Sequence, residues 1–421
     1  MALLVKMLHP ISEIAASLSS ASEQRVRLSR DTEATAAPNS ATKTPSGERQ
    51  VSDPAAAVVE ALADPLDYPP LADSIVPGDR VAIAIDEAVP QLPKVLRGAF
   101  KAVQRSGVDP EAIAIVTTDA QTSQICHEAL AQHTPALPQF VVHDPNDEAN
   151  LCMVGMTKRK EPLRVNRTIF DADVVLPIGC ARPDNRGAYD SLFPRFSDAE
   201  AIKRFRAPTN WRPTAGVAEK KPAADKAGWL IGVAMTVQVV PGENETVANV
   251  VAGEPQAVAR RSKALSRARW LVHSPHRVGL VVATITGGPA SQTWANVGRA
   301  LAAAEPLLEV GGAVAICCNL DVPPGESLGR SIGSTDLEKT EREILKDQNA
   351  DSWPALQLVR ALQRGTIYFL SQLDAETVED MGLAPIADVN ELARLVARHE
   401  SFAVLEDAQH AVATVEEDDH E

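Results

Sequence analysis

Polar or glycine residues that could bind a ligand follow several apolar, strand-like runs of the sequence. Asp86 comes after VAIAI, Thr117–Asp119 end the run AIAIVTT, and Cys180–Arg182 stand at the end of ADVVLPIGC. Gly287–Pro289 follow a fourth run, VGLVVATIT. Open α/β sheets bind their ligands just beyond the carboxyl ends of their strands. We therefore expect these residues to lie at ligand-binding edges, with Gly287 and Gly288 offering backbone N–H groups to an anion.

The loop after the third run contains two arginines, Arg182 and Arg186, which flank Asp184. A guanidinium binds a carboxylate through two parallel hydrogen bonds, so this loop could hold a small carboxylate ligand. The arginines could equally pair with acidic neighbours, namely Asp184, Asp190 or Asp198. Both interpretations stay open at this point.

The thiols and imidazoles offer few catalytic candidates. Cys180 could be a nucleophile, because a neighbouring Arg182 would stabilise its thiolate, although a buried structural thiol is the more common case. Cys317 and Cys318 are adjacent in an apolar run, so their side chains should point to opposite faces of a strand. His143 precedes Asp144-Pro145, a pattern that favours an Asx-type turn over catalysis. We predict no metal site from the remaining histidines, among them His127, His273 and His276.

These residues need a scaffold, and the periodicity predicts an α/β fold. From residue 78, strand-like runs alternate with helical ones, in the rhythm of a parallel sheet covered by helices. The rhythm continues through FVVHD and ADVVLPIGC, and it resumes with VGLVVATIT, a helix over about residues 292–308 and the strand AVAICCNL. Gly311–Gly312 should end that helix. We predict two lobes, each a mostly parallel sheet flanked by helices, with a cleft between them.

Composition sets the expected boundaries. Residues 29–52 are rich in Ala, Thr, Ser, Pro and charge without an apolar period, which is typical of disorder. Asp53 should cap the first helix, with Pro54 in its first turn. Pro208–Lys226 is interpreted as a surface excursion and Pro255–Trp270 as the helix that connects the lobes. The predicted segments are a disordered lead-in (1–52), a first α/β domain (53–269), a second (270–405) and an acidic tail (406–421).

Charge and hydropathy exclude several classes of partner. The 421 residues contain 41 basic and 56 acidic side chains, a formal net charge of −15, which disfavours nucleic acid and anionic membranes. No apolar run approaches the ~20 residues of a membrane span, and no signal peptide is recognised. Five cysteines without CxxC spacing favour a reducing cytoplasm. A small carboxylate or 2-hydroxy acid is the partner we expect, and the oligomeric state stays open.

Three long blocks reveal a family resemblance: VPGDRVAIAIDE, HDPNDEANLCMVGMTKRKEPLRVNRTIFDADVVLPIG and TITGGPASQTWANVGRALAAAEPLLEVGGAVAI. Over about residues 53–405, their order and content resemble the lactate racemase family, with its N-terminal and C-terminal domains. The resemblance implies a nickel-pincer cofactor and hydride transfer at the carbon of a 2-hydroxy acid. It also implies a lysine that tethers the cofactor, a histidine that binds nickel, and two histidines that act as acid and base.

The chain departs from this pattern at each catalytic position. The first acid–base histidine falls on Ala120, the second on Asp184 and the tethering lysine on Pro194. The nickel-binding histidine should follow the lysine by about one helix, yet no histidine lies between His143 and His273. Asp86 matches a family carboxylate, but the family's arginine three positions later is Val89 here, which removes a phosphate clamp.

In the second domain the family's Gln-x-x-Lys pair falls on Asn296 and Arg299, and its tryptophan on Trp353. The resemblance and the strand ends together predict these substrate- or anion-binding residues: Asp86, Arg182, Arg186, Gly287, Gly288, Asn296, Arg299 and Trp353. Asp184 and Cys180 are weak catalytic candidates, and no cofactor is expected.

Three functions follow as hypotheses. The chain could be a divergent family member that keeps its cleft and binds a small carboxylate or 2-hydroxy acid without nickel-pincer chemistry. It could instead be an active 2-hydroxy-acid racemase or epimerase in which Asp119, Asp184 or Cys180 replaces the family groups. It could also be a scaffold or regulatory subunit that uses the lead-in and the charged excursion to bind a partner.

Overall fold

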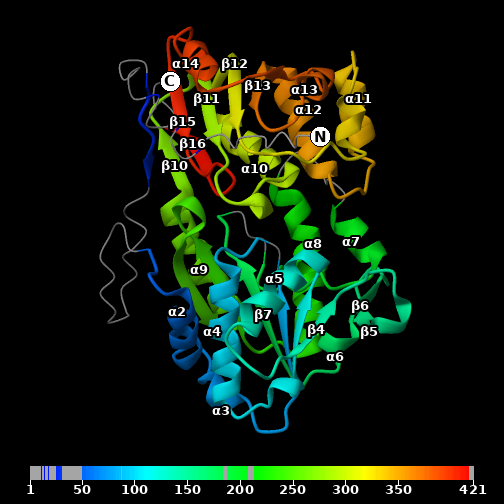
Figure 1. The fold of residues 1–421 in the computed structure, drawn as a ribbon. Helices are drawn as coiled ribbons and strands as arrows, with labels where there is room; N and C mark the ends of the chain where they lie inside the picture. Colours follow the sequence, from blue (N-terminus) through cyan, green and yellow to red (C-terminus); the bar gives the residue numbers. More distant parts are fainter. Residues whose placement is uncertain are drawn as a thin grey trace, which may run out of the picture. The chain divides into compact units, whose positions relative to one another are not determined.

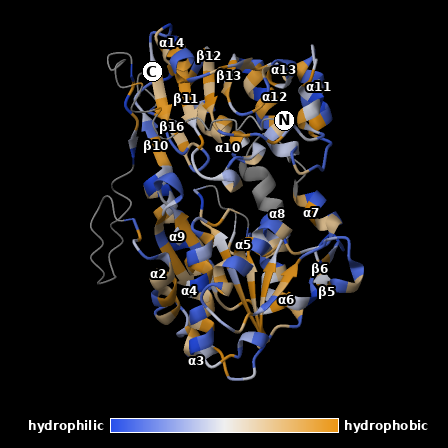
Figure 2. Ribbon diagram, in the orientation of Figure 1, coloured by the Kyte–Doolittle hydropathy of each residue, from blue (hydrophilic) through white to orange (hydrophobic). Residues whose placement is uncertain are grey.

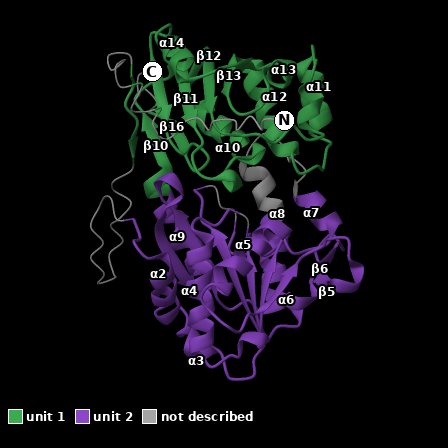
Figure 3. Cartoon of the chain, viewed as in Figure 1, with its two compact units in different colours: residues 1–34, 206–209, 267–421 green, residues 35–205, 210–266 purple. Residues whose placement is uncertain are grey.

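The computed structural model describes residues 11, 14, 18, 25–30, 50–86, 88–183, 187–206 and 213–416, with backbone only for 206 and 213–220 (Figure 1). Two compact units divide the chain (Figure 3). Unit 1 comprises residues 1–34, 206–209 and 267–421, and unit 2 comprises residues 35–205 and 210–266. Asp184 and Arg186 lie outside the described residues. The predicted cleft between the lobes stays a prediction.

Unit 2 contains a six-stranded sheet in the order β4-β3-β2-β7-β8-β9, parallel except for the β8–β9 pair. Its strands are β2 (Val81–Ile85), β3 (Ile113–Thr117), β4 (Gln139–Val142), β7 (Val174–Cys180), β8 (Thr236–Pro241) and β9 (Val247–Gly253). A hairpin of β5 (Leu151–Met156) and β6 (Pro162–Asn166) stands apart from this sheet. Every residue of β2 is buried, as expected for a continuous apolar run in a parallel sheet.

The helices of unit 2 are α2 (Pro54–Ala63), α3 (Leu71–Ser74), α4 (Leu92–Arg105), α5 (Ala120–Ala131), α6 (Arg167–Phe170), α7 (Ala199–Arg206), α8 (Pro213–Ile231) and α9 (Pro255–Trp270). Of these, α7 and α9 end in residues of unit 1, at position 206 and at positions 267–270. Asp53 caps α2 as predicted, because its side chain accepts hydrogen bonds from the N–H groups of Ala55 and Ala56. One sheet face packs against α2, α4 and α5. The other face packs against apolar residues of the segment 187–197 and of α6.

Unit 1 contains a five-stranded parallel sheet in the order β14-β13-β12-β11-β15. Its strands are β11 (Val278–Thr284), β12 (Leu308–Cys317), β13 (Ile367–Leu370), β14 (Ala384–Pro385) and β15 (Phe402–Leu405). A second sheet joins β1 (Ser29–Arg30), β10 (Leu271–Ser274) and β16 (Val412–Val415). The helices are α10 (Trp294–Ala304), α11 (Leu337–Ile344), α12 (Ser352–Arg364), α13 (Ala375–Asp380) and α14 (Val389–Val396).

Both units confirm the predicted α/β class, with mostly parallel sheets between helices. Figure 2 shows the strands of both large sheets coloured mainly as hydrophobic, while the helices carry hydrophilic residues as well. No helix in the described ranges is long and apolar enough to cross a membrane.

The described residues of the predicted lead-in (1–52) differ from the prediction of disorder, whereas residues 31–49 lie outside the described part of the chain. Ile11, Ile14 and Leu18 are buried in unit 1, in the core cluster that also contains residues of β15 and α14. Further along, Val26 donates a backbone hydrogen bond of 2.8 Å to Phe402, and β1 pairs antiparallel with β10. The apolar spacing i, i+3, i+7 of Ile11, Ile14 and Leu18 suits one buried face.

Three further boundaries differ. The predicted acidic tail contains β16 and the buried Ala408 and Ala413, so ordered chain continues past residue 405. Part of the expected surface excursion forms α8, in which Ala224 and Ala227 are buried. Gly311–Gly312 lie inside β12 instead of ending a helix, since α10 already ends at Ala304 and Pro306 disfavours its continuation.

Candidate functional site

The carboxyl edge of the unit 2 sheet brings the predicted residues together. Because β2, β3, β4 and β7 run parallel, the residues that follow them emerge at the same edge. The backbone N–H of Asp86 donates to the carbonyl of Ile178 in β7 at 2.9 Å. The N–H of His143 donates to the carbonyl of Thr117 at 2.8 Å. The edge thus places Asp86, Thr117 and the end of β7 on neighbouring strands.

Asp86 forms an ion pair that the sequence did not predict. Its side chain is 8% exposed and meets the Nε of Arg195, whose side chain is 27% exposed. Arg195 directly follows Pro194, the position on which the family's tethering lysine falls. In the sequence, the one sign of this pair is a basic residue next to position 194. The sequence alone does not indicate that this arginine pairs with Asp86, more than a hundred positions away. The pair joins β2 to the segment 187–197, which packs on the sheet face.

Arg182 is the unusual cation of this edge. The residue is 8% exposed, and its Nε is buried without a hydrogen-bond partner. Among the described residues, no carboxylate forms an ion pair with it. Of the three predicted alternative partners, Asp190 accepts from the Gly187 N–H at 2.9 Å, and one carboxylate oxygen of Asp198 accepts from the Ala201 N–H at 2.9 Å. The third, Asp184, lies outside the described residues. A buried charge without a counter-ion is unfavourable by several kcal/mol, so this position suits an anionic ligand.

Asp119 has a structural role in the described geometry. As the N-cap of α5 it accepts hydrogen bonds from the Thr122 N–H and hydroxyl, both at 2.7 Å. The Thr117 hydroxyl donates to the Asp119 carbonyl at 3.1 Å. Both oxygens of the Asp119 carboxylate therefore accept hydrogen bonds at the start of α5. Ala120, the first residue of this helix, has no titratable side chain.

The cysteines are buried. Cys180 is 3% exposed, with its Sγ 3.9 Å from the Ala181 carbonyl oxygen. Cys317 and Cys318 belong to core clusters on opposite faces of the unit 1 sheet, as predicted. Burial raises the pKa of both thiols, that of Cys318 to about 12. The adjacent pair therefore stays protonated at neutral pH and serves packing.

His143 is a buried hydrogen-bonding residue. Its Nε2 donates to the Ser197 carbonyl at 2.8 Å, and its Nδ1 accepts from the Asn166 amide at 3.2 Å. Burial lowers the pKa of this imidazole, so the neutral form is favoured. The neighbouring Asp144 accepts from the Asn146 N–H at 2.9 Å, which is the expected Asx turn. With both ring nitrogens engaged, His143 has no atom left for a metal.

In unit 1, the candidates predicted from the family form one local group. The Asn296 amide donates to the Ser291 carbonyl at 2.7 Å, and Arg299 donates to the Asn296 side-chain oxygen at 2.7 Å. A Cβ at Gly298 would lie 2.9 Å from the Trp353 ring, so α10 and α12 are in close contact there. Gly287 adopts a left-handed φ of 101°, which favours glycine. Whether this group binds an anion stays a prediction.

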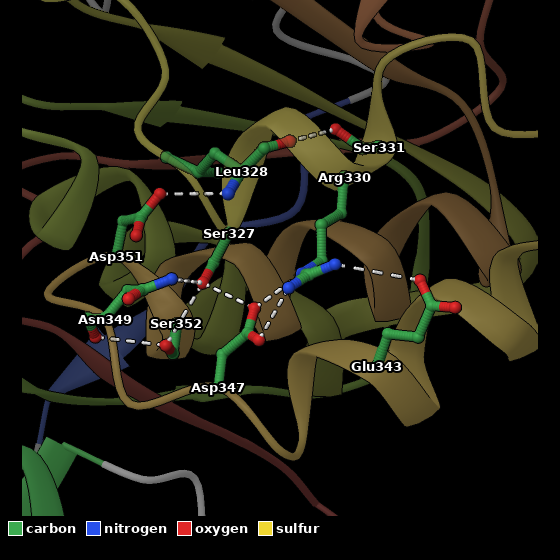
Figure 4. Close-up of polar contacts among 9 residues, drawn as sticks. All are labelled: Ser327, Leu328, Arg330, Ser331, Glu343, Asp347, Asn349, Asp351 and Ser352. Atoms are coloured by element: carbon green, nitrogen blue, oxygen red, sulfur yellow. Dashed lines mark hydrogen bonds and ion pairs between the residues drawn. The ribbon is translucent and has the colours of Figure 1, made fainter.

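A polar network beyond β12 was missed by the sequence analysis (Figure 4). Asp347 accepts from the Ser327 hydroxyl at 2.7 Å and from two nitrogens of Arg330, at 2.7 and 2.9 Å. Asp351 accepts from the Leu328 N–H at 2.9 Å. The network connects residues 327–330, which follow β12 in the chain, to the residues just before α12. Because its members bond to one another, we infer a structural role.

The described residues also lack a metal centre. No group of three or more His, Cys, Asp or Glu side chains among them could hold a metal ion. Position 184, where one family histidine falls, lies outside the described residues. Positions 120 and 194 carry alanine and proline, which supply neither imidazole nor amine.

Comparisons with known proteins agree with this architecture. Residues 30–191 match the lactate racemase N-terminal domain. A lactate racemase from Thermoanaerobacterium thermosaccharolyticum is 24% identical over 279 residues, which cover 61% of this chain and 64% of the relative. The aligned part therefore spans less than two thirds of that relative's length.

Two solved structures share the fold. The lactate racemase apoprotein of the same organism has a TM-score of 0.71 at 21% identity, covering 86% of this chain and 93% of that one. A protein from Thermotoga maritima has a TM-score of 0.63 at 14% identity, covering 88% and 100%.

The fold and its edges define a class first: a two-unit α/β protein with polar residues gathered at the carboxyl ends of parallel strands. The matches then agree with the family resemblance that the sequence blocks predict. Residues 30–191 match the lactate racemase N-terminal domain, and the chain is similar to a lactate racemase in sequence and to its apoprotein in fold.

Proposed function

We propose that this chain is a divergent lactate racemase-like protein that binds a small carboxylate, of the 2-hydroxy acid class, at the carboxyl edge of the unit 2 sheet. In this proposal the chain does not perform nickel-pincer hydride transfer. The observation that carries the proposal is Arg182, a residue more than nine-tenths buried whose Nε has no hydrogen-bond partner and which has no counter-ion among the described residues. A bound carboxylate would supply the missing charge through bidentate hydrogen bonds.

The absence of hydride transfer is supported by the chemistry of the side chains. Nickel in a pincer cofactor requires a neutral imidazole ligand and a tether, and acid–base catalysis at the hydroxyl requires a group that titrates near working pH. The chain has no histidine between His143 and His273, and His143 uses both ring nitrogens in protein hydrogen bonds. The residues therefore do not fit the family cofactor.

The other two hypotheses gain less support. An active racemase with replaced groups would need a free base, but Asp119 caps α5 and Cys180 is buried, while Asp184 lies outside the described residues. A scaffold that binds through the lead-in would need those residues accessible. Ile11, Ile14 and Leu18 are instead buried in unit 1, and Arg25–Arg30 make backbone pairings there.

Calorimetric titration of the full chain with L-lactate and D-lactate tests the binding. We expect saturable binding that Arg182→Met abolishes and Arg182→Lys weakens, since lysine keeps the charge but loses the bidentate geometry. Arg80→Met is the matched control, because Arg80 pairs with Asp173 on the surface at the amino ends of β2 and β7. Binding that survives Arg182→Met unchanged would refute the proposed site.

A second experiment tests the chemistry. Protein produced beside the cofactor-assembly enzymes is assayed for nickel content and intact mass. We expect neither stoichiometric nickel nor a mass increment on a lysine. Stoichiometric nickel, or inversion of lactate by the purified chain, would refute the proposed loss of hydride transfer.

A further inference from the structure

We infer that the β5–β6 hairpin of unit 2 is a docking surface for anionic lipid membranes. The surface is separate from the proposed carboxylate site, and the inference does not depend on that site. Its basis is that exposed apolar side chains lie beside a basic turn on the outer face of the hairpin.

The hairpin has an inner and an outer face. Leu163 and Val165 of β6 are buried in a cluster with residues of α7 and α8, so they mark the inner face (Figure 1). Successive residues of a strand point to opposite faces, and residues directly paired across antiparallel strands share a face. Arg164 therefore points outward, and so does Met153, its partner in β5.

Two methionines and a tryptophan expose apolar surface here. Met153 is 52% exposed, and Met156, which pairs with the outward Pro162, is 49% exposed. Trp229 of α8 is 74% exposed. One helical turn before it, the Nζ of Lys226 donates to the Met156 carbonyl at 2.6 Å, which brings this part of α8 close to β5. Large apolar side chains gathered on a surface are typical of an interaction site.

The turn between the two strands carries three exposed basic residues, Lys158, Arg159 and Lys160. Residues 151–166 contain four basic side chains and one acidic one, whereas the whole chain has a net charge of −15. The acidic side chain, Glu161, lies 4.0 Å from the Nε of Arg204 and is compensated there. Exposed charges more than about 8–10 Å apart are largely screened at physiological ionic strength, so the local basic turn decides what approaches the hairpin.

An anionic bilayer surface matches both features of the hairpin. Its head groups attract the basic turn, and an indole is suited to the interface because an apolar ring carries a polar N–H group. The flexible methionine side chains adapt to a fluid surface. An acidic amphipathic helix would instead need a groove that encloses its apolar side chains, whereas the outer face of a two-stranded hairpin presents its side chains outward. A lipid surface therefore fits better than an acidic protein segment.

Co-sedimentation with lipid vesicles tests the inference. The full chain is mixed with vesicles of phosphatidylcholine and phosphatidylserine in equal parts, and separately with vesicles of phosphatidylcholine alone. We expect binding to the anionic vesicles that weakens as the salt concentration rises. Binding to the neutral vesicles should be weaker by about tenfold or more.

Variants assign the binding to the hairpin. Lys158→Gln combined with Lys160→Gln should weaken binding about twentyfold, since each basic residue near an anionic surface contributes about fivefold. Trp229→Ala should weaken it by about tenfold or more, because the indole no longer leaves water. Lys94→Gln combined with Lys101→Gln is the matched control. It removes the same charge from exposed positions of α4 and should change binding by no more than about twofold.

Fluorescence quenching by brominated phosphatidylcholine in the anionic vesicles locates the tryptophan. The wild type should lose fluorescence when it binds, because Trp229 enters the lipid interface. Trp229→Phe should still bind, since phenylalanine keeps an apolar ring, but it should be quenched much less. Equal quenching of both proteins would show that Trp229 does not meet the lipid, against the inference.

Four further outcomes would overturn the inference. The first is no binding to the anionic vesicles, and the second is equal binding to both kinds of vesicle. The third is unchanged binding of the double variant at positions 158 and 160, shown to be folded by circular dichroism. The fourth is binding to soluble poly-L-glutamate without binding to vesicles, which would assign the surface to an acidic protein. None of these measurements involves lactate, so their results are independent of the proposed carboxylate binding.

Discussion

Replacing Arg182 with methionine should stabilise the protein while abolishing ligand binding. Arg182 is 8% exposed, and its Nε lies buried without a partner. The effective penalty for a buried ion is several kcal/mol, and substituting a buried ion pair with apolar groups of similar volume often stabilises a protein by about 1–4 kcal/mol. Methionine retains the length of the side chain and adapts to irregular space. The residue keeps 8% of its surface exposed, so we expect a gain near the lower half of that range, about 1–2 kcal/mol.

Urea unfolding of the full chain in ligand-free buffer measures this gain. Because two units can unfold separately, hydrogen exchange of the strands β2 and β7 should accompany the optical signal and locate the effect in unit 2. Arg80→Met provides the comparison, since Arg80 forms an exposed surface pair whose loss should change stability by at most about 1 kcal/mol. Saturating L-lactate should narrow the difference between wild type and Arg182→Met, because a ligand that binds only the native wild type stabilises it.

The result that would refute the reasoning is a clear loss of stability in Arg182→Met. Such a loss would mean that the native protein already supplies Arg182 with a counter-ion from its own chain. The site would then be a structural ion pair, and the argument for an anionic ligand at this position would fail.

Three further predictions concern the framework of the site. Ile14 is fully buried in unit 1, so Ile14→Ala should lower the free energy of unfolding by about 2–4 kcal/mol. The same substitution should speed hydrogen exchange in β15. Unchanged exchange would show that Ile14 does not pack against this strand. Gly179→Ala should destabilise unit 2 by about 1–3 kcal/mol in urea unfolding, because the new Cβ would lie 2.8 Å from side-chain atoms of Gln238 and Ser191. An unchanged urea midpoint of unfolding would contradict this packing. His143 has a pKa lowered from 6.5, so the folded state resists its protonation and stability should fall as pH decreases from above 6.5 through that lowered pKa. In His143→Gln this part of the pH dependence should vanish, and unfolding curves between pH 8 and pH 5 that keep the wild-type slope would count against the buried neutral imidazole.

Local features of the fold could be predicted because their causes are local. The apolar run VAIAI forms β2 with the predicted bounds, Asp53 caps α2, and the adjacent Cys317 and Cys318 lie on opposite faces of their sheet. Each of these depends on a few neighbouring residues and on the periods of strand and helix. The family resemblance rests on blocks of sequence in a fixed order, and it needed no knowledge of tertiary contacts.

The sequence by itself also determined that no histidine lies between His143 and His273, and the proposed loss of the family chemistry rests on this observation. Only the tertiary structure decided how the remaining residues are used. It joined Arg195 to Asp86, and it turned His143 toward Ser197, 54 residues away. It buried the Nε of Arg182 away from any hydrogen-bond partner in the described part of the chain, and it packed Ile14 into a unit built mostly from the far end of the chain. Such contacts depend on how separate segments pack, and no local period encodes which distant side chain will meet which.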